Sequence, residues 1–135
     1  MSFSPDTEKL VNDLIQAEYK NACKKFGETY HSLHGGYAVL LEEVEEAKFH
    51  IDDLFGDMYG FWSGVKENNK LYCKDGVGYL FKHTTNAMKE LAQVGAVLMK
   101  IANTISEMKI KNTFGEVKES EMSKFFCFLS KNKKI

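Results

Sequence analysis

The chain of 135 residues contains no arginine, so all 18 of its basic residues are lysine. Arginine supplies the planar, fork-shaped group that most often makes bidentate contacts with phosphate and guanine. Its absence, together with a formal net charge of −1, argues against a protein dedicated to binding nucleic acid polymers. Small phosphate-bearing ligands remain compatible with this composition.

Cysteine and long apolar runs are also scarce. The three cysteines, Cys23, Cys73 and Cys127, are widely spaced and form no CxxC pair. We interpret them as reduced, mostly buried thiols. The sequence has no apolar run of the roughly 18 residues needed to span a membrane, and its first residues lack the charged-then-apolar pattern of a secretory signal. We therefore expect a soluble, cytoplasmic protein that does not bind membranes.

Proline occurs once, at Pro5, directly after Ser4, which is the pairing typical of a helix N-cap followed by the first helical turn. Apolar residues then recur at three- and four-residue spacing and predict helices over about 5–26, 37–66, 79–109 and 114–131. Sustained alternation with period two, the signature of strands, is absent. The stretch 67–78 contains paired asparagines and two glycines, and we predict a loop there. The expected fold is a single all-α domain, a four-helix-type bundle over residues 1–135.

An unusual concentration of acid lies in the predicted helix 37–66. At about 100° per residue, Glu42, Glu43 and Glu46 flank its apolar stripe. Glu45 points the other way and fits a solvated surface charge. Like charges at this spacing repel one another. The bias is explained if a hard divalent cation, Mg²⁺ or alternatively Mn²⁺, binds there through carboxylate oxygens.

A further carboxylate, Glu90, borders the apolar stripe of the predicted helix 79–109, where an unpaired charge is costly. If the two helices pack antiparallel, Glu90 opposes the turn Glu42–Glu46 and completes an oxygen-rich site. We interpret Asp53 and Asp57 as surface charges and His50 as a surface or helix-packing residue. A solvated acidic helix face is the alternative interpretation of the whole pattern.

Two segments carry a family resemblance: Ser32–Glu46, SLHGGYAVLLEEVEE, and Glu90–Ala96, ELAQVGA. They resemble the MazG-like, all-α nucleoside triphosphate pyrophosphohydrolases, above all the phage-associated members, whose signature is EExxE on one helix and ExxD on the next. The resemblance implies a helical bundle, dimeric or of higher order, that holds Mg²⁺ on these acids. It also implies a bacterial or phage-encoded enzyme that cleaves the α–β phosphate bond of a nucleoside triphosphate, releasing a monophosphate and pyrophosphate.

Carried over residue by residue, the resemblance assigns metal binding to Glu42, Glu43, Glu46 and Glu90, with catalytic roles for Glu43 and Glu46. Gln93 stands where the family has the second acid of ExxD. An amide oxygen can still bind Mg²⁺, but it brings no negative charge. The alternative function is therefore a helical binding or interaction module that keeps the bundle and has lost catalysis.

Other side chains are weaker candidates for contacts with the nucleotide. They are Gln93, His34, Tyr37, Lys48, Lys82 and Lys89. The lysines are candidate partners for phosphate, whereas His34 and Tyr37 either contact the base or sugar or cap and pack the start of their helix. We interpret the aromatic residues Tyr59, Phe61 and Trp62 as core or dimer interface rather than as a base-stacking wall.

Overall fold

The computed structural model describes residues 2–108, and its first helix, α1, spans Pro5–Phe26. The Ser4 side chain accepts a hydrogen bond from the Thr7 backbone N–H at 3.2 Å, which satisfies one of the free donors of the first turn. At the other end Gly27 has φ 78°, a backbone conformation that favours glycine. The helix therefore covers the residues that its capping signals predict.

The second helix, α2, spans Leu33–Lys66 and begins earlier than the predicted residue 37. The Ser32 side chain caps it by accepting from the Gly35 N–H at 3.1 Å, so the glycine pair lies inside the first turn. A Cβ atom on Gly36 would lie 3.0 Å from Cγ1 of Ile101. The predicted start was wrong because this glycine permits close helix packing and does not mark a loop.

The third helix, α3, spans Lys70–Glu107, so the predicted loop 67–78 and the predicted start at residue 79 are wrong. The turn is confined to residues 67–69, where Asn68 has φ 51° and Asn69 accepts from the Tyr72 N–H at 3.0 Å as the helix N-cap. Gly76 lies within the helix, where a Cβ atom would meet Cδ2 of Phe61 at 3.3 Å. The predicted helix 114–131 and Cys127 lie outside the described residues.

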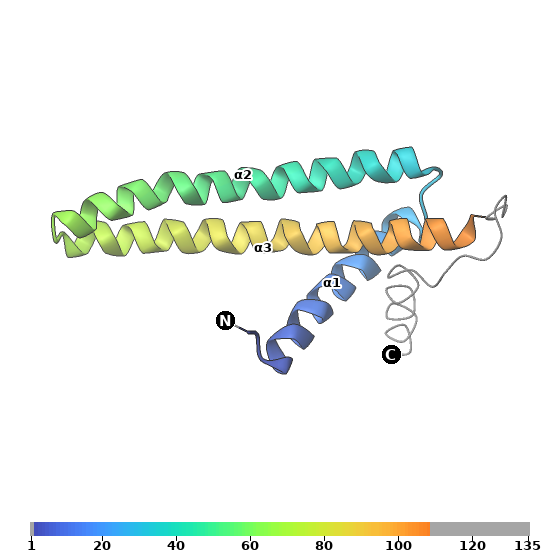
Figure 1. Ribbon diagram of the computed structural model, residues 1–135, viewed down its shortest axis with the longest axis horizontal. Helices are drawn as coiled ribbons and strands as arrows, with labels where there is room; N and C mark the ends of the chain where they lie inside the picture. Colours follow the sequence, from blue (N-terminus) through green and yellow to red (C-terminus); the bar gives the residue numbers. More distant parts are fainter. Residues whose placement is uncertain (1, 109–135) are drawn as a thin grey trace.

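Helices α2 and α3 form a long antiparallel hairpin and run side by side over their whole length (Figure 1). With 34 and 38 residues, they are about 51 and 57 Å long at about 1.5 Å per residue. α1 packs at an angle against the C-terminal half of α3 (Figure 1). The described part of the chain is thus all-helical, with three helices and no strand, and it contains no helix long and apolar enough to cross a membrane.

The core lies where α1 meets α3. It is built from Tyr19 together with Ala96, Met99 and Ala102, with Ile15 and Cys23 packed around it. The Tyr19 hydroxyl accepts a hydrogen bond from the Asn103 side chain, so the polar end of this buried ring is satisfied. Cys23 and Cys73 are free thiols, but both are half-buried rather than buried as predicted.

The remainder of the hairpin, residues 50–86, is a two-helix arm (Figure 1). Large aromatic side chains on it face solvent, with Tyr59 77% and Trp62 57% exposed. Phe61 instead packs against Gly76 across the hairpin. Of the two predicted roles for Tyr59 and Trp62, core or dimer interface, the core role is wrong within a single chain, because two paired helices cannot enclose side chains on their outer faces.

Candidate functional site

Three glutamates meet between the two long helices, close to the crossing of α1. Glu43 and Glu46 come from α2 and Glu90 from α3, and one carboxylate oxygen of each lies within 4.8 Å of the others. The antiparallel packing of α2 and α3 places Glu90 opposite the acidic turn. We call these three residues the carboxylate cluster. Glu42, also predicted as a ligand, is exposed and does not belong to this group.

The cluster concentrates negative charge at a partly buried position. Burial raises the pKa of Glu43, and the charges of Glu46, Glu90 and Glu42 raise it further. Burial also raises the pKa of Glu90, as do the charge of Glu46 and a hydrogen bond with it, whereas His50 and Lys89 act in the opposite direction. Glu43 and Glu90 are half-buried and Glu46 is exposed. Like charges held this close together favour either a shared proton or a bound cation.

Gln93 lies between two members of the cluster. With its amide nitrogen turned toward them, it donates to Oε2 of Glu43 at 2.7 Å and to Oε2 of Glu90 at 3.0 Å. This orientation follows from the hydrogen bonds, because the reverse would place the amide oxygen against acceptors. Gln93 therefore acts as a hydrogen-bond donor to the cluster, not as the oxygen ligand that the sequence suggested.

A cleft of about 230 Å³ adjoins the cluster and is bordered by all three helices. Its lining residues are Glu18, Asn21, Ala22, Lys25, Phe26, Tyr30, Val39, Glu43, Gln93, Ala96, Val97 and Lys100. Lys100 is only 5% exposed. Its Nζ donates to the Phe26 carbonyl at 3.2 Å and lies 4.3 Å from the centre of the Tyr30 ring. One cleft thus combines carboxylates with a buried cation and aromatic rings.

Sequence reasoning missed three residues of this cleft: Lys25 of α1, Tyr30 of the turn that follows α1, and Lys100 of α3. One signal was present. Lys100 falls on the apolar stripe of its helix, between Val97 and Thr104, both of which are buried. A lysine in that position needs a partner for its charge, although the pattern does not reveal which one.

Most of the weaker candidates for contacts with the nucleotide lie outside the cleft. Apart from Gln93, none of them lines the cleft as the structure describes it. Lys48 pairs with Asp52 at 2.5 Å on the surface, and Tyr37 is 63% exposed. His34, Lys82 and Lys89 are exposed too. Lys89 is nevertheless near enough to Glu90 to affect its pKa.

Residues set aside as surface groups prove to be partners across the hairpin. His50 packs between α2 and α3 with Nε2 3.9 Å from Oε1 of Glu90, so its interpretation as a helix-packing residue is confirmed. Asp53 and Asp57 both approach His83 of α3.

Comparisons of the chain with models of protein families, with curated proteins and with solved structures find no match.

Proposed function

We propose that this chain is a Mg²⁺-dependent nucleoside triphosphate pyrophosphohydrolase of the MazG-like all-α type, which cleaves the α–β phosphate bond to release a nucleoside monophosphate and pyrophosphate. One observation carries the proposal. Glu43 joins the carboxylate cluster to a cleft that it lines together with Lys25 and Lys100. A triphosphate needs both features, a site for a divalent cation and positive charge beside it.

The residues present fit a hard cation. Mg²⁺ prefers carboxylate oxygens and is commonly held by few of them together with phosphate oxygens. Glu43, Glu46 and Glu90 would hold it, with Mn²⁺ as the alternative. Burial and, after it, mutual repulsion raise the pKa of Glu43 and Glu90, and a bound cation would relieve the repulsion. When bound, the ion neutralises phosphate charge and lowers the pKa of water.

The side chains themselves supply the other requirements of hydrolysis. The Glu43 carboxylate borders the cleft and can accept a proton from an attacking water. Lys25 and Lys100 line the same cleft and can neutralise the departing pyrophosphate. Phe26 and Tyr30 offer aromatic rings to a base at the cleft wall.

The test is pyrophosphate release from a panel of ribo- and deoxyribonucleoside triphosphates with Mg²⁺ or Mn²⁺. We expect metal-dependent release, reduced at least about 100-fold in Glu43→Gln because a positioned general base contributes about 10²–10⁴ in rate. Glu45→Gln is the matched control, since Glu45 is an exposed glutamate of the same helix outside the cluster. Full activity in Glu43→Gln would refute the assignment.

A second candidate function, a binding module without turnover, is favoured by Gln93. Its amide already places a hydrogen-bond donor between Glu43 and Glu90, where the family has an acid. This candidate predicts that nucleotide binds, as measured by calorimetry, but that no pyrophosphate is released. Gln93→Asp then discriminates further, because an added carboxylate raises the Mg²⁺ affinity of a decayed metal site and leaves an unrelated scaffold unchanged.

The proposal includes self-association, as the resemblance implies. The exposed aromatic side chains of the two-helix arm, including Tyr59 and Trp62, support it because soluble monomers rarely leave large apolar patches open to water. A homodimer that pairs two such arms would complete a four-helix bundle.

A further inference from the structure

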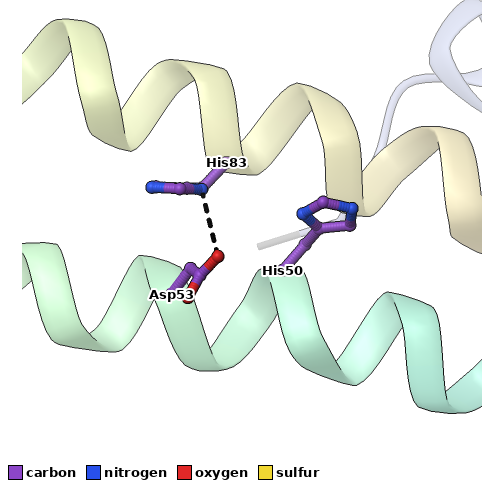
Figure 2. Close-up of side chains that lie close together, drawn as sticks. All are labelled: His50, Asp53 and His83. Carbon is purple, nitrogen blue, oxygen red and sulfur yellow. Dashed lines mark ion pairs between the residues drawn. The ribbon is translucent and has the colours of Figure 1, made fainter.

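A second group of potential ligands lies further along the hairpin, and it differs in chemistry from the carboxylate cluster. His50 and Asp53 project from α2 toward His83 of α3, and Figure 2 shows the three side chains facing one another between the helices. One potential ligand atom of each lies within 4.8 Å of the others. Two imidazoles and one carboxylate therefore converge from two helices on one place.

The hydrogen bonds of His83 determine which ring nitrogen is available. Its Nε2 lies 2.8 Å from Oδ2 of Asp57. Because an ionised carboxylate only accepts, Nε2 carries the proton, and in the neutral form of the ring Nδ1 then has the lone pair. That Nδ1 is buried and has no hydrogen-bond partner among the described residues. Asp53 is its nearest ion-pair neighbour, at 3.9 Å, which is too far for a hydrogen bond.

His50 repeats the arrangement. Its Nε2 faces Oε1 of Glu90 at 3.9 Å, and its Nδ1 is likewise buried without a hydrogen-bond partner in the described part of the chain. Buried polar atoms are almost always satisfied. Two unsatisfied imidazole nitrogens beside one carboxylate, each on a ring whose other nitrogen faces an acid, match the pattern of metal-binding histidines oriented by outer carboxylates.

We propose that His50, Asp53 and His83 bind a divalent transition-metal ion such as Zn²⁺, with Asp57 positioning the His83 ring. Imidazole nitrogen is a preferred donor for such ions, whereas Mg²⁺ selects oxygen. Ligand bonds of about 2.0–2.2 Å require the three side chains to close by about an ångström. Three protein ligands leave a coordination position open, and the partial exposure of His50 and His83, at 23% and 19%, gives the ion a route in.

The three proposed ligands are not members of the carboxylate cluster, although the two groups adjoin where His50 faces Glu90, and the proposal does not rest on pyrophosphohydrolase activity. The ion would join α2 to α3 through His50, Asp53 and His83. An ion that binds only the folded hairpin stabilises it by mass action. At a hundredfold excess over the Kd, we expect the Tm to rise by roughly 5–15 °C.

The test uses the full chain without a histidine tag, stripped of metal and titrated with Co²⁺ as a spectroscopic substitute for Zn²⁺. We expect one equivalent to bind with the visible absorption of nitrogen-ligated Co²⁺, and Zn²⁺ to displace it. His83→Gln and Asp53→Asn lose the absorption and at least about tenfold in affinity. His31→Gln is the matched control, because His31 is exposed and outside the group, and its spectrum stays that of the parent chain.

Two further measurements keep the outcome decisive. The chain has four histidines, so proton NMR of the unaltered protein reports on each ring, and Zn²⁺ should shift the signals of His50 and His83 alone. Glu43→Gln, which removes a member of the carboxylate cluster, should still bind Co²⁺ with the same spectrum. The proposal is overturned if Zn²⁺ leaves the His50 and His83 signals unchanged, or if Glu43→Gln abolishes the Co²⁺ absorption while His83→Gln keeps it.

Discussion

Glu43 illustrates how a single side chain on the packed face of a helix acquires unusual chemistry. Burial and the neighbouring charges of Glu46, Glu90 and Glu42 raise its pKa. The folded state therefore binds the proton of Glu43 more tightly than the unfolded state does. The resulting stability is fully present below the ordinary pKa of 4.5 and is lost as the pH rises through the raised pKa.

This pH dependence predicts how Glu43→Gln changes stability. With metal removed by a chelator, the variant should have the same stability as the parent chain near pH 4, where Glu43 is protonated, and should be more stable than the parent as the pH approaches 7. Because like-charge pairs cost a few tenths of a kcal/mol each, we expect a gain in Tm of roughly 1–4 °C at pH 7. Thermal denaturation followed by circular dichroism at several pH values measures the difference.

Glu45→Gln serves as control, since it removes an exposed glutamate of the same helix and leaves the cluster intact. It should show no gain that grows with pH. A Glu43→Gln protein that is less stable than the parent at pH 7 would mean that hydrogen bonding by Gln93 to Glu43 outweighs the repulsion.

At the scale of the helix, glycines act through packing. A Cβ atom on Gly95 of α3 would lie 2.9 Å from three atoms of Ile15 on α1. A Cβ atom on Gly56 of α2 would have no neighbouring atom within 4 Å among the described residues. The two residues are both helical, and they differ in whether another helix approaches.

Alanine substitution at these glycines should therefore have opposite effects. Gly95→Ala should lower the free energy of unfolding by about 1–2 kcal/mol, because overpacking of about 1–3 kcal/mol outweighs the gain in helix propensity. Gly56→Ala should raise it by about 0.5–1 kcal/mol. Urea denaturation of the two variants measures both values. Equal stabilisation by both would show that α1 does not pack closely on α3 in solution.

At the scale of the whole molecule, the two-helix arm is the feature least consistent with a monomer. Phe55, Tyr59 and Trp62 follow one another at helical spacing on α2 and are 61%, 77% and 57% exposed. A pair of helices alone cannot bury them. An exposed apolar stripe of this kind is typical of an interaction surface.

We expect the chain to form a homodimer in sedimentation equilibrium, and Tyr59→Glu to weaken the association at least about tenfold, because a charge then enters the interface. Lys66→Glu is the control, as it changes an exposed charge at the end of the same helix. A parent chain that is monomeric at every concentration tested would contradict this prediction.

Local sequence determined that the described part of the chain forms three helices and that Glu43 and Glu46 share a face, but not where α2 and α3 begin. Helix α1 follows from Ser4, Pro5 and Gly27, because capping depends on neighbouring residues only. The grouping of Glu43 and Glu46 on one side of α2 likewise follows from helical periodicity, and the antiparallel arrangement of the helices was enough to expect Glu90 opposite them.

Tertiary structure decided the features that depend on how the helices meet. Gly36 and Gly76 suggest breaks in the sequence, yet both lie within helices because another side chain occupies the space of the missing Cβ. The register of α2 against α3 pairs Asp57 with His83, and the position of α1 brings Lys25 to the cleft beside Glu43. These contacts join residues distant in the chain, so no local pattern encodes them, and only packing of the complete hairpin against α1 determines which side chains meet.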